Sequence, residues 1–152
     1  MSTKIKQKNV LISMCLVGVP CRYNATPSSV LIPAEIFNKY NLIPVCPEQL
    51  GGLATPRLPS EIQSGDGSNV LHGTAGVINI NRDDVTNNFI LGAEQTLKLA
   101  EKFEADCFIG QLGSPSCSCS KIYNGSFTDT LKSGLGVTAA LLKHNRIEII
   151  EY

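Results

Sequence analysis

The sequence has no excess of charge of either sign, because 13 Lys and Arg residues balance 13 Asp and Glu residues among its 152 residues. Proteins that bind nucleic acid or an acidic membrane through their overall charge are usually strongly basic, so this class of function is disfavoured. A local basic patch is still compatible with equal numbers of basic and acidic residues. We therefore expect no membrane partner, and no nucleic-acid partner that is held by net charge alone.

Long apolar runs are also missing. The run from Val10 to Val19 is interrupted by Ser13, Cys15 and Gly18. It is too short for a membrane span, and it resembles a signal peptide poorly. With 43% hydrophobic residues the chain can still build a core. We expect all 152 residues to form a single domain in the cytoplasm.

No two cysteines are spaced as a CxxC pair, which counts against zinc ribbons and thioredoxin-like redox motifs. Six cysteines are nevertheless present. A disulfide framework is disfavoured, because no export signal is recognisable and the chain has enough apolar residues to fold unaided. The cysteines are therefore interpreted as metal ligands or as a reactive thiol.

Apolar runs and amphipathic segments alternate along the chain. Strands are expected at residues 9–17, 42–45, 105–112 and 146–151, and helices at 34–40, 83–103 and 137–143. Residues 55–69 and 113–132 are expected to be loops, with a hairpin made by residues 70–72 and 77–80 between them. The alternation predicts an α/β fold, a Rossmann-like three-layer sandwich with a mainly parallel sheet.

Three cysteines, Cys15, Cys46 and Cys117, lie at or after the ends of expected strands. In open parallel sheets ligands bind beyond the carboxyl ends of the strands, so these thiols are expected to converge. Three thiolates without an obvious fourth suit zinc or an iron–sulfur cluster with one open position. Cys107, in the middle of an expected strand, is interpreted as an ordinary buried residue.

The turn after Cys46 carries further reactive groups. Pro47 should end the strand, since it lacks a backbone N–H, and Glu48 then lies beside the thiol. Gly51 and Gly52 allow backbone angles and close approaches that side chains forbid, and Arg57 adds a permanent cation. The residues leave three readings of Glu48 open: a proton-transfer group, a solvated loop carboxylate, or an ion-pair partner of Arg57.

Four separate motifs, in their order and spacing, resemble the signatures of the TudS thiouracil desulfurase family. They are MCLVGVPCRY at residues 14–23, VCPEQLGGLATPR at 45–57, DVT at 84–86 with Phe89, and SPSC at 114–117. The resemblance runs almost from end to end, and the run at 45–57 is its most specific part.

The resemblance implies that Cys15, Cys46 and Cys117 hold a [4Fe-4S] cluster with one iron free of protein ligands. It implies non-redox removal of sulfur, as hydrosulfide, from a thiolated pyrimidine base or nucleoside. Glu48 would be the general base, and Ser114 would hydrogen-bond the substrate or relay the proton. The implied partner is this small molecule, and the chain would be a monomer or a homodimer. A non-catalytic zinc or cluster protein and a module acting on thiouridine in tRNA are the alternatives.

The sequence departs from the family pattern at three places. Gln111-Leu112-Gly113 stands before the last motif, where a basic residue is usual, and Ser118-Cys119 stands after it, where glycine is usual. Asn24-Ala25-Thr26 replaces an acidic-Gly turn. Cys119 and Cys21 are extra thiols that could serve as ligands or stay free.

Overall fold

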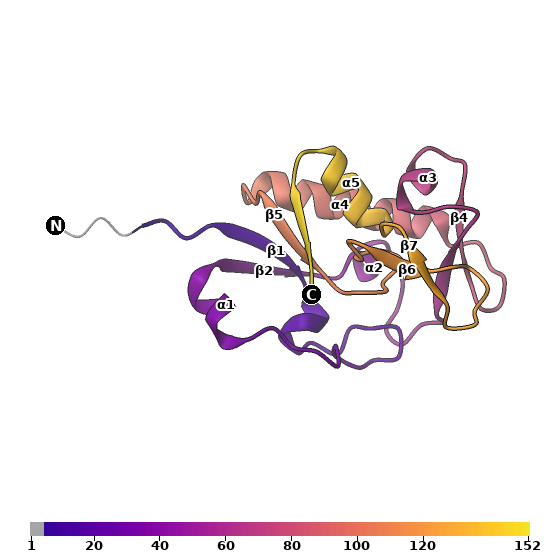
Figure 1. The fold of residues 1–152 in the computed structure, drawn as a ribbon, viewed down its shortest axis with the longest axis horizontal. Helices are drawn as coiled ribbons and strands as arrows, with labels where there is room; N and C mark the ends of the chain where they lie inside the picture. The colour runs from indigo at the N-terminus through magenta and orange to yellow at the C-terminus, as the bar shows by residue number, and fades with distance from the viewer. Residues whose placement is uncertain (1–4) are drawn as a thin grey trace.

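The computed structural model describes residues 5–152 and centres on a four-stranded parallel sheet with strand order β2-β1-β5-β8 (Figure 1). The strands are β1 (Asn9–Ser13), β2 (Asn41–Val45), β5 (Cys107–Gly110) and β8 (Glu148–Glu151). In the central strand, Val10 is paired with Leu42 on one side and with Cys107 on the other. The predicted α/β fold with a parallel sheet is therefore confirmed.

Helical segments cover both faces of this sheet. They are the 3-10 helix η1 (Met14–Val17), α1 (Ala34–Lys39), α4 (Thr86–Lys102) and α5 (Val137–His144). Successive side chains of a strand point to opposite faces. Val10 and Ile12 accordingly pack in the core beneath η1 and α1, whereas Leu11 and Phe108 pack against α4 and α5 (Figure 1). Burial on both faces explains why β1 is a continuous apolar run.

Smaller elements lie beside the main sheet, at the right of Figure 1. They are α2 (Pro47–Leu50), β3 (Ser60–Gln63), α3 (Gly67–Leu71), β4 (Gly76–Asn79), β6 (Lys121–Tyr123) and β7 (Leu131–Ser133). β3 pairs with β4, and β6 pairs with β7, in two antiparallel ribbons. Among residues 5–152 there is no helix with the length and apolar character needed to cross a membrane.

The strand expected at 77–80 is present as β4, but the other predictions for residues 55–80 were wrong. The expected loop contains β3 and α3, the expected hairpin strand at 70–72 falls at the end of α3, and β4 pairs with β3 instead. Asp66 explains the helix: its carboxylate accepts the N–H groups of Ser68 (3.0 Å) and Asn69 (3.4 Å), and the Asn69 side chain accepts the Asp66 N–H. This reciprocal cap starts a helix among residues that otherwise favour loops.

Other element bounds also differ from the expectation. β1 ends at Ser13 rather than residue 17, because the apolar run continues as η1 and stops at Gly18, whose φ is 95°. An apolar run cannot by itself separate strand from helix. The expected loop at 113–132 contains β6 and the start of β7. The helix expected from residue 83 begins at Thr86, where the Asp84 carboxylate accepts the Thr86 N–H at 2.9 Å.

Gly51 lies where α2 meets α4. A Cβ atom at this position would stand 2.0 Å from the carbonyl oxygen of Asn88, and one at Gly92 would stand 2.0 Å from that of Pro47. The two backbones therefore touch only because both residues lack a side chain. We expect Gly51→Ala to lower the free energy of unfolding by about 2 kcal/mol, measured by urea denaturation, because backbone must move.

Gly73→Ala is the matched control for this change. Its added methyl group would meet nothing within 4 Å, so only the positive φ of 79° opposes it. That conformation costs roughly 1 kcal/mol. A Gly51→Ala protein as stable as the Gly73→Ala protein would contradict the proposed close packing of α2 on α4.

Candidate active site

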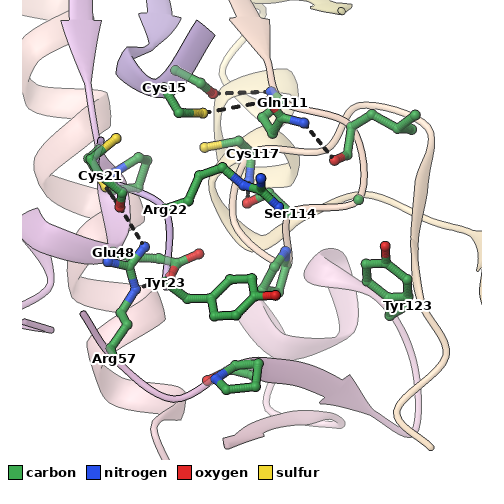
Figure 2. Close-up of a pocket in the computed structure, with 18 of the residues that line it drawn as sticks. Cys15, Cys21, Arg22, Tyr23, Glu48, Arg57, Gln111, Ser114, Cys117 and Tyr123 are labelled. Carbon is green, nitrogen blue, oxygen red and sulfur yellow. Dashed lines mark hydrogen bonds and ion pairs between the residues drawn. The ribbon is translucent and has the colours of Figure 1, made fainter. Parts of the chain in front are cut away.

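A cavity of about 190 Å³ lies beyond the carboxyl ends of β1, β2 and β5 (Figure 2). The structure brings every site residue expected from the sequence to its wall: Cys15, Cys46, Glu48, Ser114 and Cys117. All three strands run parallel, so their ends share one edge of the sheet.

Each thiol is delivered by the segment that follows a strand. Cys15 lies in η1, immediately after β1, and Cys46 directly follows β2. Pro47 is the first residue of α2, which stops the strand at Cys46 and turns the chain into the site. Both cysteines are buried.

Cys117 is held by a serine turn. The Ser114 hydroxyl oxygen accepts the backbone N–H groups of Ser116 (3.1 Å) and Cys117 (3.0 Å). Both bonds use lone pairs of the oxygen, so the hydroxyl hydrogen can still be donated to a molecule in the cavity. Ser114 therefore positions a thiol and also offers a donor.

Three thiols of the cavity, those of Cys21, Cys46 and Cys117, have raised pKa values. Burial is the main cause for Cys117, and a hydrogen bond with Cys21 is the main cause for Cys46. A hydrogen bond with Cys15 raises the pKa of Cys21 to about 11. These groups are therefore neutral thiols near pH 7 unless a cation draws the thiolate form.

The extra thiols differ in position. Cys21 lines the cavity, and its carbonyl oxygen accepts the Cys46 thiol at 3.8 Å. The Cys119 thiol instead donates to the carbonyl oxygens of Cys117 (3.5 Å) and Ile150 (3.6 Å), outside the cavity wall. Of the two, only Cys21 is within reach of a group bound in the cavity.

Cys107 is buried in the core on β5, away from the cavity. The sequence-based interpretation of this residue as an ordinary core cysteine agrees with that position. Burial raises the pKa of Cys107 to about 11.

Glu48 forms an ion pair with Arg57, whose Nε lies 2.5 Å from Glu48 Oε2. The side chains are 13% and 9% exposed, so the reading of Glu48 as a solvated carboxylate is wrong. The Arg57 guanidinium also donates to Thr55 Oγ1 (2.9 Å) and to the carbonyl oxygen of Cys21 (3.1 Å). These contacts fix the carboxylate, and no hydrogen bond among residues 5–152 engages Glu48 Oε1.

The opposite wall of the cavity carries Gln111, where the sequence lacks the basic residue usual in the resembled family. Its side-chain oxygen accepts the Cys15 thiol at 3.6 Å, and its backbone N–H donates to Ser13 Oγ at 3.1 Å. Arg22 and Tyr23 also line the cavity, although the sequence-based search did not select them. A permanent cation directly after Cys21 was the signal that could have identified Arg22.

The comparison with protein families matches residues 10–152 to the model described as 2-thiouracil desulfurase. The chain belongs to the 2-thiouracil desulfurase family. The resemblance seen in the four sequence motifs is thus confirmed.

Two known proteins resemble this member of the 2-thiouracil desulfurase family over nearly their whole lengths. The solved structure of the [4Fe-4S]-dependent thiouracil desulfidase TudS superimposes with a TM-score of 0.83, at 32% identity, covering 96% of this chain and 91% of that chain. The uncharacterized protein YbbK of Bacillus subtilis (strain 168) is 40% identical over 141 residues, which is 93% of each chain.

The donor set of the cavity fits the cluster on which TudS depends. Among residues 5–152, no three His, Cys, Asp or Glu side chains meet at a point where one metal ion would bind. A four-iron cluster does not need such a point, because each iron takes its own cysteine thiolate. Cys15, Cys46 and Cys117 surround a common cavity, which is the arrangement that a group larger than one ion requires.

Proposed function

We propose that this protein is an iron–sulfur-dependent desulfurase that hydrolyses the carbon–sulfur bond of a thiolated pyrimidine base or nucleoside. The observation that carries the proposal is one cavity, in a member of the 2-thiouracil desulfurase family, walled by three thiols and a fixed carboxylate. The cavity, of about 190 Å³, has room for a small molecule.

Cys15, Cys46 and Cys117 would hold a [4Fe-4S] cluster through their thiolates. Three protein ligands leave one iron of such a cluster available. When bound, the cluster supplies a Lewis-acidic iron that takes up the sulfur of the substrate. Burial of the three cysteines keeps bulk water away from these ligands.

Glu48 would accept a proton from the attacking water. Arg57 engages one carboxylate oxygen, and the other, which no hydrogen bond among residues 5–152 engages, would take the proton. Ser114 would donate its hydroxyl hydrogen to the substrate. The oxygen of water replaces sulfur on the ring carbon, and sulfur departs with its electron pair as hydrosulfide. No group is oxidised or reduced.

Anaerobic turnover tests this function. Protein loaded with iron and sulfide is incubated with 2-thiouracil, and uracil and sulfide are quantified together. We expect one sulfide for each uracil. Fully loaded protein that forms neither product from thiopyrimidine bases or nucleosides would reject the proposal and leave a non-catalytic cluster protein.

Loss of the cluster in air should expose the position of Cys21. Because the Cys21 thiol is close enough to those of Cys15 and Cys46 for both to shift its pKa, we expect oxidised, cluster-free protein to contain a disulfide between Cys21 and one of them. Peptide mapping by mass spectrometry without reduction identifies the pair. A Cys117–Cys119 disulfide as the main product would contradict the arrangement in the structure.

A further inference from the structure

Arg22 is firmly placed on the wall of the cavity. Its backbone N–H donates to the carbonyl oxygen of Thr26 at 3.2 Å, and its own carbonyl accepts the N–H of Ala25 at 2.8 Å. The next residue, Tyr23, accepts the backbone N–H of Arg57 at 2.8 Å. The turn is therefore tied both to itself and to the segment that fixes Glu48.

The guanidinium of Arg22 differs from that of Arg57 in its contacts. Among residues 5–152, no ion pair and no side-chain hydrogen bond involves it, and its one aromatic contact is the ring of its neighbour Tyr23, 5.8 Å away. Figure 2 shows the side chain extending into the cavity in the direction of Ser114. A half-buried cation with five free N–H donors facing a cavity is suited to bind a ligand.

The acidic groups of the cavity do not neutralise Arg22. Glu48 is paired with Arg57, and Glu61 accepts the backbone N–H groups of Gly125 (2.9 Å) and Phe127 (3.2 Å). Asp129 also lines the cavity but forms no ion pair with Arg22. The charge of Arg22 is thus available to a molecule that enters.

We propose that Arg22 binds the carbonyl oxygen of a thiopyrimidine substrate and so selects rings that carry a carbonyl group besides the thiocarbonyl. This inference rests on the proposed desulfurase function. A guanidinium on that oxygen draws electron density from the ring, which favours addition of water to the thiocarbonyl carbon. Its planar fork of donors also fixes the orientation of the ring. Gln111 is less suited to this task, because its amide nitrogen already donates to the carbonyl oxygen of Leu112 at 3.2 Å.

A pair of substrates separates this role from a general effect of charge. 2-Thiouracil carries the ring carbonyl, and 2-thiopyrimidine lacks it. In Arg22→Met we expect kcat/KM for 2-thiouracil to fall about a hundred-fold, while that for 2-thiopyrimidine changes less than about three-fold. Uracil, the product, should bind the loaded variant at least about ten-fold more weakly in calorimetry. Arg146→Met is the control, since Arg146 is exposed and outside the cavity.

The outcomes are distinct. Equal losses on both substrates, with uracil binding unchanged, would overturn the proposal, because Arg22 would then act only through its charge or on folding. If wild-type protein turns over neither substrate, the proposed function fails. The role of Arg22 is then tested by uracil binding alone, and equal affinity in wild type and Arg22→Met overturns the inference. If Arg22→Met loses its cluster, Arg22→Lys and Arg22→Gln are compared instead, each at wild-type iron content. We then expect the lysine variant to bind uracil more tightly than the glutamine variant.

Discussion

Replacing Cys15, Cys46 or Cys117 by serine is expected to remove most of the cluster and, with it, the release of sulfide. Each change removes one of the three protein ligands that we assign, so the cluster would be attached through two cysteines only. Iron and acid-labile sulfide per protein chain, measured after anaerobic reconstitution, give the occupancy. Sulfide release from 2-thiouracil should fall in proportion to that occupancy or further.

The remaining cysteines provide matched controls. Cys107 is buried in the core on β5, and Cys119 donates to backbone carbonyl oxygens away from the cavity, so Cys107→Ala and Cys119→Ser should keep the cluster. Cys21→Ser should keep it too, if iron requires only the three assigned ligands. Wild-type iron content in all three ligand variants would show that the assigned cysteines are not the ligands. Loss of iron in Cys21→Ser would instead identify Cys21 as a fourth ligand.

The convergence of the three cysteines could be predicted because it depends mainly on topology. Strands β1, β2 and β5 are apolar on both faces, which indicates a parallel sheet, and parallel strands end at one edge. Pro47 marks the end of β2, just before Cys46, without any long-range information. Topology therefore brings Cys15 and Cys46 to one edge, and the turn held by Ser114 places Cys117 on the same cavity.

Features that depend on contacts between distant segments were not predictable in the same way. The pairing of β3 with β4 encloses a helix, α3, whose start depends on a reciprocal cap between Asp66 and Asn69. Cys21 and Cys119 look alike in sequence, but one enters the cavity and the other turns toward β8, because the folding of each loop decides the direction of its thiol. The ion pair of Glu48 was one of several open readings until the geometry selected it.

Glu48→Gln is expected to slow desulfuration roughly a hundred-fold while the cluster stays in place, which is the usual effect of losing a general acid–base group. The amide keeps the size of the side chain and can still accept a hydrogen bond from Arg57, but it cannot take a proton from water. Sulfide release under anaerobic conditions, divided by cluster content, is the measurement. This division prevents poor reconstitution from being mistaken for poor catalysis.

Two variants show whether the loss belongs to Glu48. Asp84→Asn is the matched control, since Asp84 is an exposed carboxylate at the start of α4 and lies outside the cavity wall. Ser114→Ala should lower turnover as well, and it should also lower cluster content, because its oxygen holds the backbone N–H of Cys117. Glu48→Gln should leave cluster content unchanged, since Glu48 supplies no ligand. Turnover per cluster close to wild type in Glu48→Gln would assign the proton transfer to another group.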